Sequence, residues 1–163
     1  MEVVSQNGWD LLAIDLFLER LESLTQEVEK IYRKHPTKVT KHHKYKLLMA
    51  VSSAIFEEVP ANPDDSRFRQ GNTLGPDNKS WRRVKKGLPT RYRLFFQFRS
   101  AHRPKSIVYA WLNDESTIRK AGAKTDVYEA FKKLLEQGQV PKTWDELAGA
   151  AQPLPKDADE EAS

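Results

Sequence analysis

The sequence contains no cysteine among its 163 residues. Disulfide bonds, thiol nucleophiles and cysteine-based metal sites are therefore excluded. It also lacks any apolar run close to the roughly 20 residues that span a bilayer, and it does not open with a charged segment followed by an apolar one. We therefore expect a soluble, cytoplasmic protein that has no membrane association.

Common catalytic and cofactor motifs are also missing. The sequence has no Gly-x-Ser-x-Gly elbow, no P-loop and no dinucleotide fingerprint. Its four histidines show no spacing that would set two of them on one helical face beside a carboxylate. Asp114 and Glu115 are adjacent acids, but in a polar loop they are better explained as helix caps than as an acid and base pair. We therefore expect neither a metal ion nor a cofactor.

Acidic residues are nearly absent from the middle of the chain. From Arg67 to Lys105 there are twelve Lys or Arg residues and a single acid, Asp77. The net charge of +4 understates this asymmetry, because acidic residues gather between Asp157 and Glu161. A local excess of positive charge favours a polyanionic partner, and nucleic acid in particular.

Hydrophobic periodicity predicts one domain over residues 1–150, followed by an acidic, disordered tail at residues 151–163. Apolar residues at helical spacing predict one helix from Asp15 to about Arg33 and a second helix after Pro36. Capping signals at Asp126 and Thr143 predict a helix over residues 127–137 and a short helix after it.

Alternating and β-favouring stretches predict the strands. We expect them at residues 8–14, where a helix start is the alternative, and at residues 81–86, 91–98 and 106–112. The loop around Phe68 either holds a short edge strand or folds over the sheet, and residues 116–120 form a helical turn. The element order predicts an α+β domain with a small, mostly antiparallel sheet and a pair of helices on one face.

The strand at residues 81–86 carries cations on both sides, because neighbouring strand residues point in opposite directions. A cationic sheet with aromatic neighbours such as Tyr92, Tyr109 and Tyr128 can bind RNA through phosphate contacts and base stacking. It can also cleave RNA, since the 2′-hydroxyl supplies the nucleophile and the protein need only align it, neutralise charge and move protons. Trp81, Arg83 and Lys85 lie on one side, opposite Arg82, Val84 and Lys86.

Several motifs follow one another at residues 81–87, 91–96, 111–115, 117–119 and 122–128, with further ones at residues 7–9 and 68–75. Taken in this order, they resemble the YhaV toxins, a branch of the RelE/ParE superfamily of type II toxin-antitoxin systems. The resemblance implies a compact RelE-like α+β microdomain. It also implies endoribonuclease cleavage of mRNA during translation on the ribosome.

Partners follow from the same resemblance. It implies an antitoxin of the PrlF type, whose DNA-binding part belongs to the AbrB type, so that operator DNA is contacted only through the toxin-antitoxin complex. The superfamily also contains gyrase inhibitors. A non-hydrolytic toxin that acts on the ribosome or gyrase, and a plain RNA-binding module, therefore remain alternatives.

Catalytic roles are implied for six residues. Arg93 resembles the arginine that contacts the scissile phosphate, and Tyr128 resembles a C-terminal tyrosine that stacks on the substrate. Arg83 and Lys85 resemble the paired lysines of the preceding strand, while the remaining basic role falls to Arg119 or Lys124. We expect further RNA contacts from four neighbours, which are Arg82, Lys86, Arg91 and Tyr92.

Overall fold

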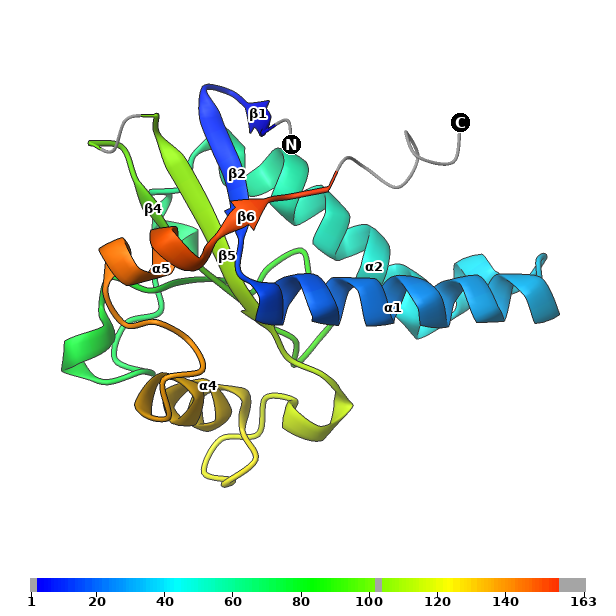
Figure 1. The fold of residues 1–163 in the computed structure, drawn as a ribbon. Coiled ribbons are helices and arrows are strands. Elements are labelled where there is room, and N and C mark those ends of the chain that lie inside the picture. Colours follow the sequence, from blue (N-terminus) through cyan, green and yellow to red (C-terminus); the bar gives the residue numbers. More distant parts are fainter. Residues whose placement is uncertain (1–2, 102–103, 156–163) are drawn as a thin grey trace.

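The structure is a computed structural model that describes residues 3–101 and 104–155. A mixed sheet lies at its centre in the order β1-β2-β5-β4-β3, and β6 pairs with β2 (Figure 1). Strands β2 and β5 run parallel, and the other pairs are antiparallel, so the expected α+β class and mostly antiparallel sheet are confirmed. The strands are β1 (Val4–Gln6), β2 (Trp9–Ala13), β3 (Arg82–Val84), β4 (Leu94–Arg99), β5 (Ser106–Leu112) and β6 (Gln152–Pro153).

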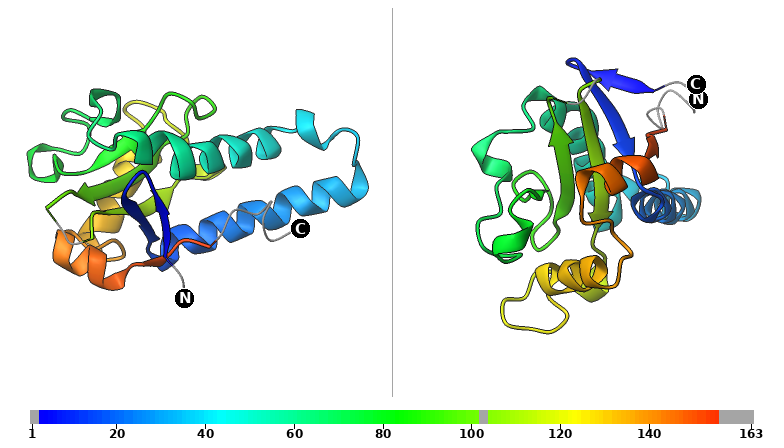
Figure 2. Two further views of the ribbon diagram at one scale, coloured as in Figure 1. Left: turned by 90° about the horizontal axis from the view of Figure 1, so that it is seen from above. Right: turned by 60° about the vertical axis from the view of Figure 1, so that its left-hand side comes forward.

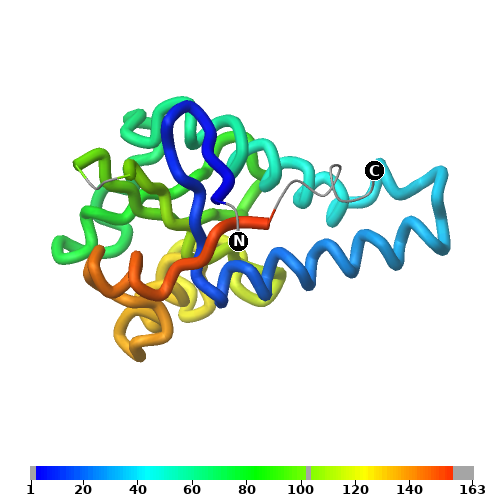
Figure 3. The backbone as a smooth tube through the Cα atoms, turned by 45° about the horizontal axis from the view of Figure 1, so that its top comes forward, coloured from blue at the N-terminus to red at the C-terminus, as the bar shows by residue number. Residues whose placement is uncertain are grey.

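Helices cover both faces of the sheet. One face packs against α1 and α2, and the other packs against α4 and α5 (Figures 1 and 3). Neighbouring strand residues supply the two cores, since Phe96 faces the first pair of helices and Phe95 faces the second. The helices are α1 (Asp15–Lys34), α2 (His43–Ser53), α3 (Val59–Ala61), α4 (Val127–Glu136) and α5 (Trp144–Ala150).

The second predicted helix is interrupted by one π-helical segment, η2 (Ala54–Glu58), between α2 and α3. The hydroxyl of Tyr109 donates a hydrogen bond of 2.8 Å to the backbone oxygen of Ile55 within this segment. Burial raises the pKa of Tyr109 well above its usual value. Tyr109 is therefore a core residue, and it does not belong to the cationic site for which the sequence suggested it.

Several predicted boundaries are wrong. The first cationic strand ends at Val84, because Gly87 with a φ of +93° starts a turn, and the next strand begins only at Leu94. Near Phe68 the chain forms a 3₁₀ helix, η3 (Ser66–Phe68), and a single bridge between Arg69 and Arg82 replaces the expected edge strand.

The chain after α5 still pairs with the sheet. Gln152 and Pro153 pair with β2, and Leu154 buries all but 2% of its surface in the core beside that strand. One apolar side chain and an open sheet edge are enough to dock this segment, although its composition gave no sign of order. The acidic stretch at residues 157–161 lies outside the described residues.

Within residues 3–101 and 104–155, no helix combines the length and the apolar character that a membrane span requires.

Candidate active site

Two arginines converge on the hydroxyl of Tyr128. The Nε atom of Arg83 donates to this oxygen at 3.1 Å, and the Nε atom of Arg93 donates to it at 3.2 Å. Arg83 comes from β3, Arg93 precedes β4, and Tyr128 lies in the first turn of α4. Three residues selected from the sequence thus meet at one oxygen atom, from three separate elements.

Each guanidinium is fixed at a second point. The Nη1 atom of Arg83 donates to the backbone oxygen of Arg67 at 2.9 Å, and that of Arg93 donates to the oxygen of Tyr92 at 2.8 Å. Among the described residues, neither Nη2 atom has a hydrogen-bond partner. Because arginine keeps its charge and carries five donors in a rigid plane, both groups are held in place with donors left over for an anion.

Asn113 positions the segment that carries Arg93. Its Oδ1 accepts a hydrogen bond of 2.8 Å from the backbone nitrogen of Arg93, and its Nδ2 donates to the backbone oxygens of Arg91 and Thr117. The backbone oxygen of Asn113 in turn accepts a hydrogen bond of 2.9 Å from Arg20 of α1. Asn113 is fully buried, so its own end of each of these bonds is shielded from water.

A third arginine lies on the ring of Tyr128. The guanidinium carbon of Arg119 sits 4.9 Å from the ring centroid, and its Nη1 forms an ion pair of 2.9 Å with Asp126. The Asp126 carboxylate also accepts hydrogen bonds from the backbone nitrogens of Lys120 and Tyr128. Burial alone would raise the pKa of Asp126, but the bonds from Lys120, Arg119 and Tyr128 outweigh it and lower that pKa below its usual value.

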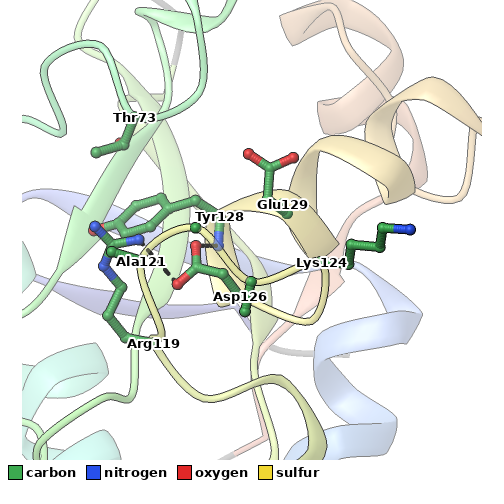
Figure 4. A pocket seen from close by; sticks show the side chains of 9 residues that line it. Thr73, Arg119, Ala121, Lys124, Asp126, Tyr128 and Glu129 are labelled. Atoms are coloured by element: carbon green, nitrogen blue, oxygen red, sulfur yellow. Dashed lines mark hydrogen bonds and ion pairs between the residues drawn. The ribbon is translucent and has the colours of Figure 1, made fainter.

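A pocket of about 320 Å³ opens beside this ion pair. Figure 4 shows Arg119 and Tyr128 together on one side of it, while the Lys124 side chain extends away from the Arg119 guanidinium. The lining combines two cations, two acids and the backbone of a glycine-containing loop, so the pocket offers charged groups to a ligand. The lining residues are Thr73, Arg119, Ala121, Gly122, Ala123, Lys124, Asp126, Tyr128 and Glu129.

The Tyr128 ring differs from the stacking platform that the resemblance implies. It is only 4% exposed, with Arg119 over its ring and Phe95 edge-on to it at 5.7 Å between ring centroids. A base cannot stack on the ring in this arrangement. The contact that Tyr128 offers is instead its hydroxyl, which holds two guanidinium groups.

The other sequence candidates are spread around this cluster. Lys85 and Lys86 are exposed in the turn after β3, where their side chains have no hydrogen bond or ion pair to the described part of the chain. Arg82 points to the opposite face of the sheet from Arg83, with its guanidinium 3.6 Å from Asp64 and over the ring of Phe98. The predicted strand pair therefore does not bring Arg83 and Lys85 together as a ladder.

Arg91 and Tyr92 mainly shape the backbone next to Arg93. Arg91 has a φ of +76°, unusual for a residue with a side chain, and its oxygen accepts a hydrogen bond of 2.9 Å from the backbone nitrogen of Arg119. Tyr92 is half-buried against the core on the α1 and α2 side, and burial together with nearby Glu115 raises its pKa.

Two residues of this site were not predicted from the sequence. Asn113 follows a buried strand directly, a position where a polar side chain signals a role beyond packing. Asp126 was recognised only as a helix cap, and nothing in its spacing indicated that it also binds Arg119. Asp114, by contrast, caps η5 (Glu115–Thr117), as expected. In the residues described, no group of three or more His, Asp or Glu side chains could hold a metal ion.

Comparison with known proteins identifies the family. Residues 11–152 match the family model for the YhaV toxin, described as a toxin with endonuclease activity, of a toxin-antitoxin system. Toxin YhaV of Escherichia coli O6:H1 and ribonuclease toxin YhaV of Escherichia coli K12 are each 42% identical to this chain over 142 residues, which is 86% of this chain and 90% of the relative. No solved structure matches it. The chain therefore belongs to the YhaV family of toxins with endonuclease activity, which confirms the resemblance found in its motifs.

Proposed function

We propose that this protein is a metal-independent endoribonuclease that cleaves mRNA on the translating ribosome, in the cytoplasm. The observation that carries the proposal is the pair of guanidinium groups held by one hydroxyl, with Nε of Arg83 and Nε of Arg93 both bonded to Tyr128. Two fixed cations with unused donors suit the non-bridging oxygens of a phosphodiester. A relative at 42% identity carries the name ribonuclease toxin, which favours RNA over DNA.

In this proposal the 2′-hydroxyl of the substrate attacks the adjacent phosphorus. A bond forms between the 2′-oxygen and phosphorus, the bond from phosphorus to the 5′-oxygen breaks, and a proton moves from the first oxygen to the second. Arg83 and Arg93 stabilise the charge that develops on the phosphate, because preorganised donors act most strongly where charge appears. The products are a 2′,3′-cyclic phosphate and a free 5′-hydroxyl.

The remaining cations take supporting roles in the proposal. Arg119 contributes positive charge at the edge of the pocket, where Asp126 holds it. Lys85 and Lys124 are exposed and able to reach a bound substrate for charge neutralisation or proton transfer. The flanking RNA would be contacted by Arg82, Lys86, Arg91 and Tyr92.

A toxin-antitoxin system includes a cognate antitoxin, and the family assignment therefore implies one. We propose an antitoxin of the PrlF type with an AbrB-type DNA-binding part, which would cover the cations around Tyr128 with an acidic segment. The toxin would then reach operator DNA only within the complex. Copurification of the two proteins at rising salt concentration tests whether the contact is electrostatic.

Cleavage assays with matched arginine variants test the proposed site. Arg93→Ala is expected to reduce cleavage of a defined RNA by roughly 100-fold, as the loss of one preorganised donor does in other enzymes. Arg99→Ala is the control, because Arg99 lies at the other end of β4, where it is exposed. Equal activity of both variants would refute the assignment of Arg93. Mapping of RNA 5′ ends with and without active translation tests the dependence on the ribosome.

A further inference from the structure

Charge is segregated along the helical hairpin formed by α1, α2 and the turn between them. Residues 15–29 contain five acids and one cation, whereas residues 30–46 contain seven Lys or Arg, three His and no Asp or Glu. We call residues 30–46 the hairpin tip. Its cations are Lys30, Arg33, Lys34, Lys38, Lys41, Lys44 and Lys46.

The hairpin tip is separate from the candidate active site. Figure 2 shows α1 and α2 lying side by side and projecting beyond the sheet, and Figure 3 shows the same projection. Arg20 marks the end of α1 nearest the site, since it donates to the backbone oxygen of Asn113. Lys34 follows 14 residues later, which places it about 21 Å further along the helix axis at a rise of about 1.5 Å per residue.

Little within the protein neutralises this charge. Lys44 pairs with Glu27, and this hydrogen bond raises the pKa of Lys44. The other six cations of the hairpin tip are exposed, and their side chains form no ion pair or hydrogen bond with residues 3–101 or 104–155. Mutual repulsion among them opposes folding, so a run of 17 residues with cations and no acids is not explained by stability.

The helix dipole strengthens this argument. Arg33 and Lys34 end α1, where positive charge is favourable. At the start of α2, however, the first turn contains Lys44 and no acid, and Lys38 and Lys41 lie just before it. Cations near a helix N-terminus are unfavourable. These lysines therefore occupy positions that suit an external anion better than they suit the helix.

The aromatic content of the hairpin tip narrows the kind of anion. Tyr32 is 58% exposed, while the rings of His42 and His43 stack on each other with centroids 4.5 Å apart. Surfaces that bind single-stranded RNA present several aromatic platforms for bases, whereas double-stranded RNA is recognised through its shape, phosphates and 2′-hydroxyls. His35 and His43 are exposed as well, but Tyr32 is the one exposed Phe, Tyr or Trp ring in residues 30–46, and a dense array of exposed cations around it fits the double-stranded form.

We propose that the hairpin tip binds the phosphate backbone of double-stranded RNA and so anchors the enzyme on folded RNA beside the strand that it cuts. This inference rests on the proposed function only in taking RNA as the polyanion. It assigns a second contact surface, at a distance from Tyr128, that recruits the enzyme without taking part in the chemistry.

Two double variants of the full chain test the proposal. Lys38→Gln with Lys41→Gln removes two charges from the hairpin tip, and Lys133→Gln with Lys142→Gln removes two exposed charges from elsewhere. Fluorescence anisotropy measures binding to a fully paired RNA of about 16 base pairs, and a gel verifies that the duplex stays intact. The hairpin-tip variant is expected to bind at least ~10-fold more weakly than the control, with a salt slope shallower by about 2.

Further readouts separate this proposal from the catalytic one. With a translated, unpaired reporter mRNA, both double variants are expected to keep cleavage, whereas Arg93→Ala loses cleavage but keeps its affinity for the duplex. Should wild-type protein cut no RNA while the hairpin-tip variant still loses duplex binding, the proposed function falls and the hairpin-tip assignment stands.

Equal duplex affinity of the two double variants overturns the inference. So does an equal loss for duplex and single-stranded RNA, or a loss of antitoxin binding with unchanged RNA affinity.

Discussion

The Oδ1 atom of Asn113 lies 2.8 Å from the backbone nitrogen of Arg93, across twenty residues of chain. The same side chain donates to the oxygen of Arg91, whose φ of +76° is strained, and to the oxygen of Thr117. One buried amide thus ties the segment before β4 to the loop after β5. The position of the Arg93 guanidinium depends on this connection, because the backbone on its N-terminal side has no strand partners.

Asn113→Ala is therefore expected to lower both stability and cleavage. Loss of the three hydrogen bonds that this buried side chain makes should reduce the free energy of unfolding by roughly 2–4 kcal/mol, measured by urea denaturation. Asn72→Ala is the control, because Asn72 is exposed in a turn, and its effect should stay within about 0.5 kcal/mol. Equal stability of the two variants would show that Asn113 does not hold the segment.

A second stability prediction concerns the π-helical segment. Tyr109→Phe keeps the ring but removes the hydroxyl that donates to Ile55, leaving a buried backbone oxygen without this partner. We expect a loss of about 1–2 kcal/mol in the free energy of unfolding. Cleavage per folded molecule should be unchanged, because Tyr109 lies on the face opposite Tyr128. Tyr32→Phe, at an exposed position, should leave stability unaltered. A similar loss of stability in Tyr32→Phe would show that the hydrogen bond from Tyr109 to Ile55 does not explain the effect.

The lowered pKa of Asp126 predicts how stability depends on pH. A carboxylate whose pKa is depressed in the folded state stabilises the protein above its unfolded pKa of about 3.9, and this contribution disappears as pH falls through the folded value. Wild-type protein should therefore lose stability as the pH drops below about 4. Asp126→Asn should be less stable at pH 7 and should show a flatter decline in acid. Chemical denaturation at a series of pH values measures both curves, and parallel curves would contradict the assigned role of Asp126.

The sequence predicted the parts of the fold that repeat a pattern. Apolar residues at helical spacing located α1 and α4 to within a few residues, and the run at Ser106–Leu112 located β5. Strands β1 and β6 were missed because three residues and two residues are too short for any periodicity to appear. Their pairing with β2 comes from tertiary contacts that no local pattern encodes.

Residue types were enough to select part of the candidate site. Backbone geometry explains which residues were selected wrongly or missed. Arg83, Arg93 and Tyr128 were chosen correctly as neighbours, but alternation alone also placed Lys85 beside Arg83. The strand ends at Val84, immediately before Lys85, and Lys85 is exposed. Asn113 and Asp126 act through bonds to distant backbone atoms and to Arg119, and such partners are set by the fold.

The central claim is that Tyr128 acts by holding arginines, and a double-mutant cycle on RNA cleavage tests it most directly. Arg83→Lys removes the Nε donor, and Tyr128→Phe removes the shared acceptor while keeping the packed ring. Each single variant should lower kcat/KM by up to roughly 100-fold. The kcat/KM of the double variant should be little lower than that of the less active single variant, because both changes break the same contact. Effects that multiply, or single variants that cleave as fast as wild type, would contradict the claim.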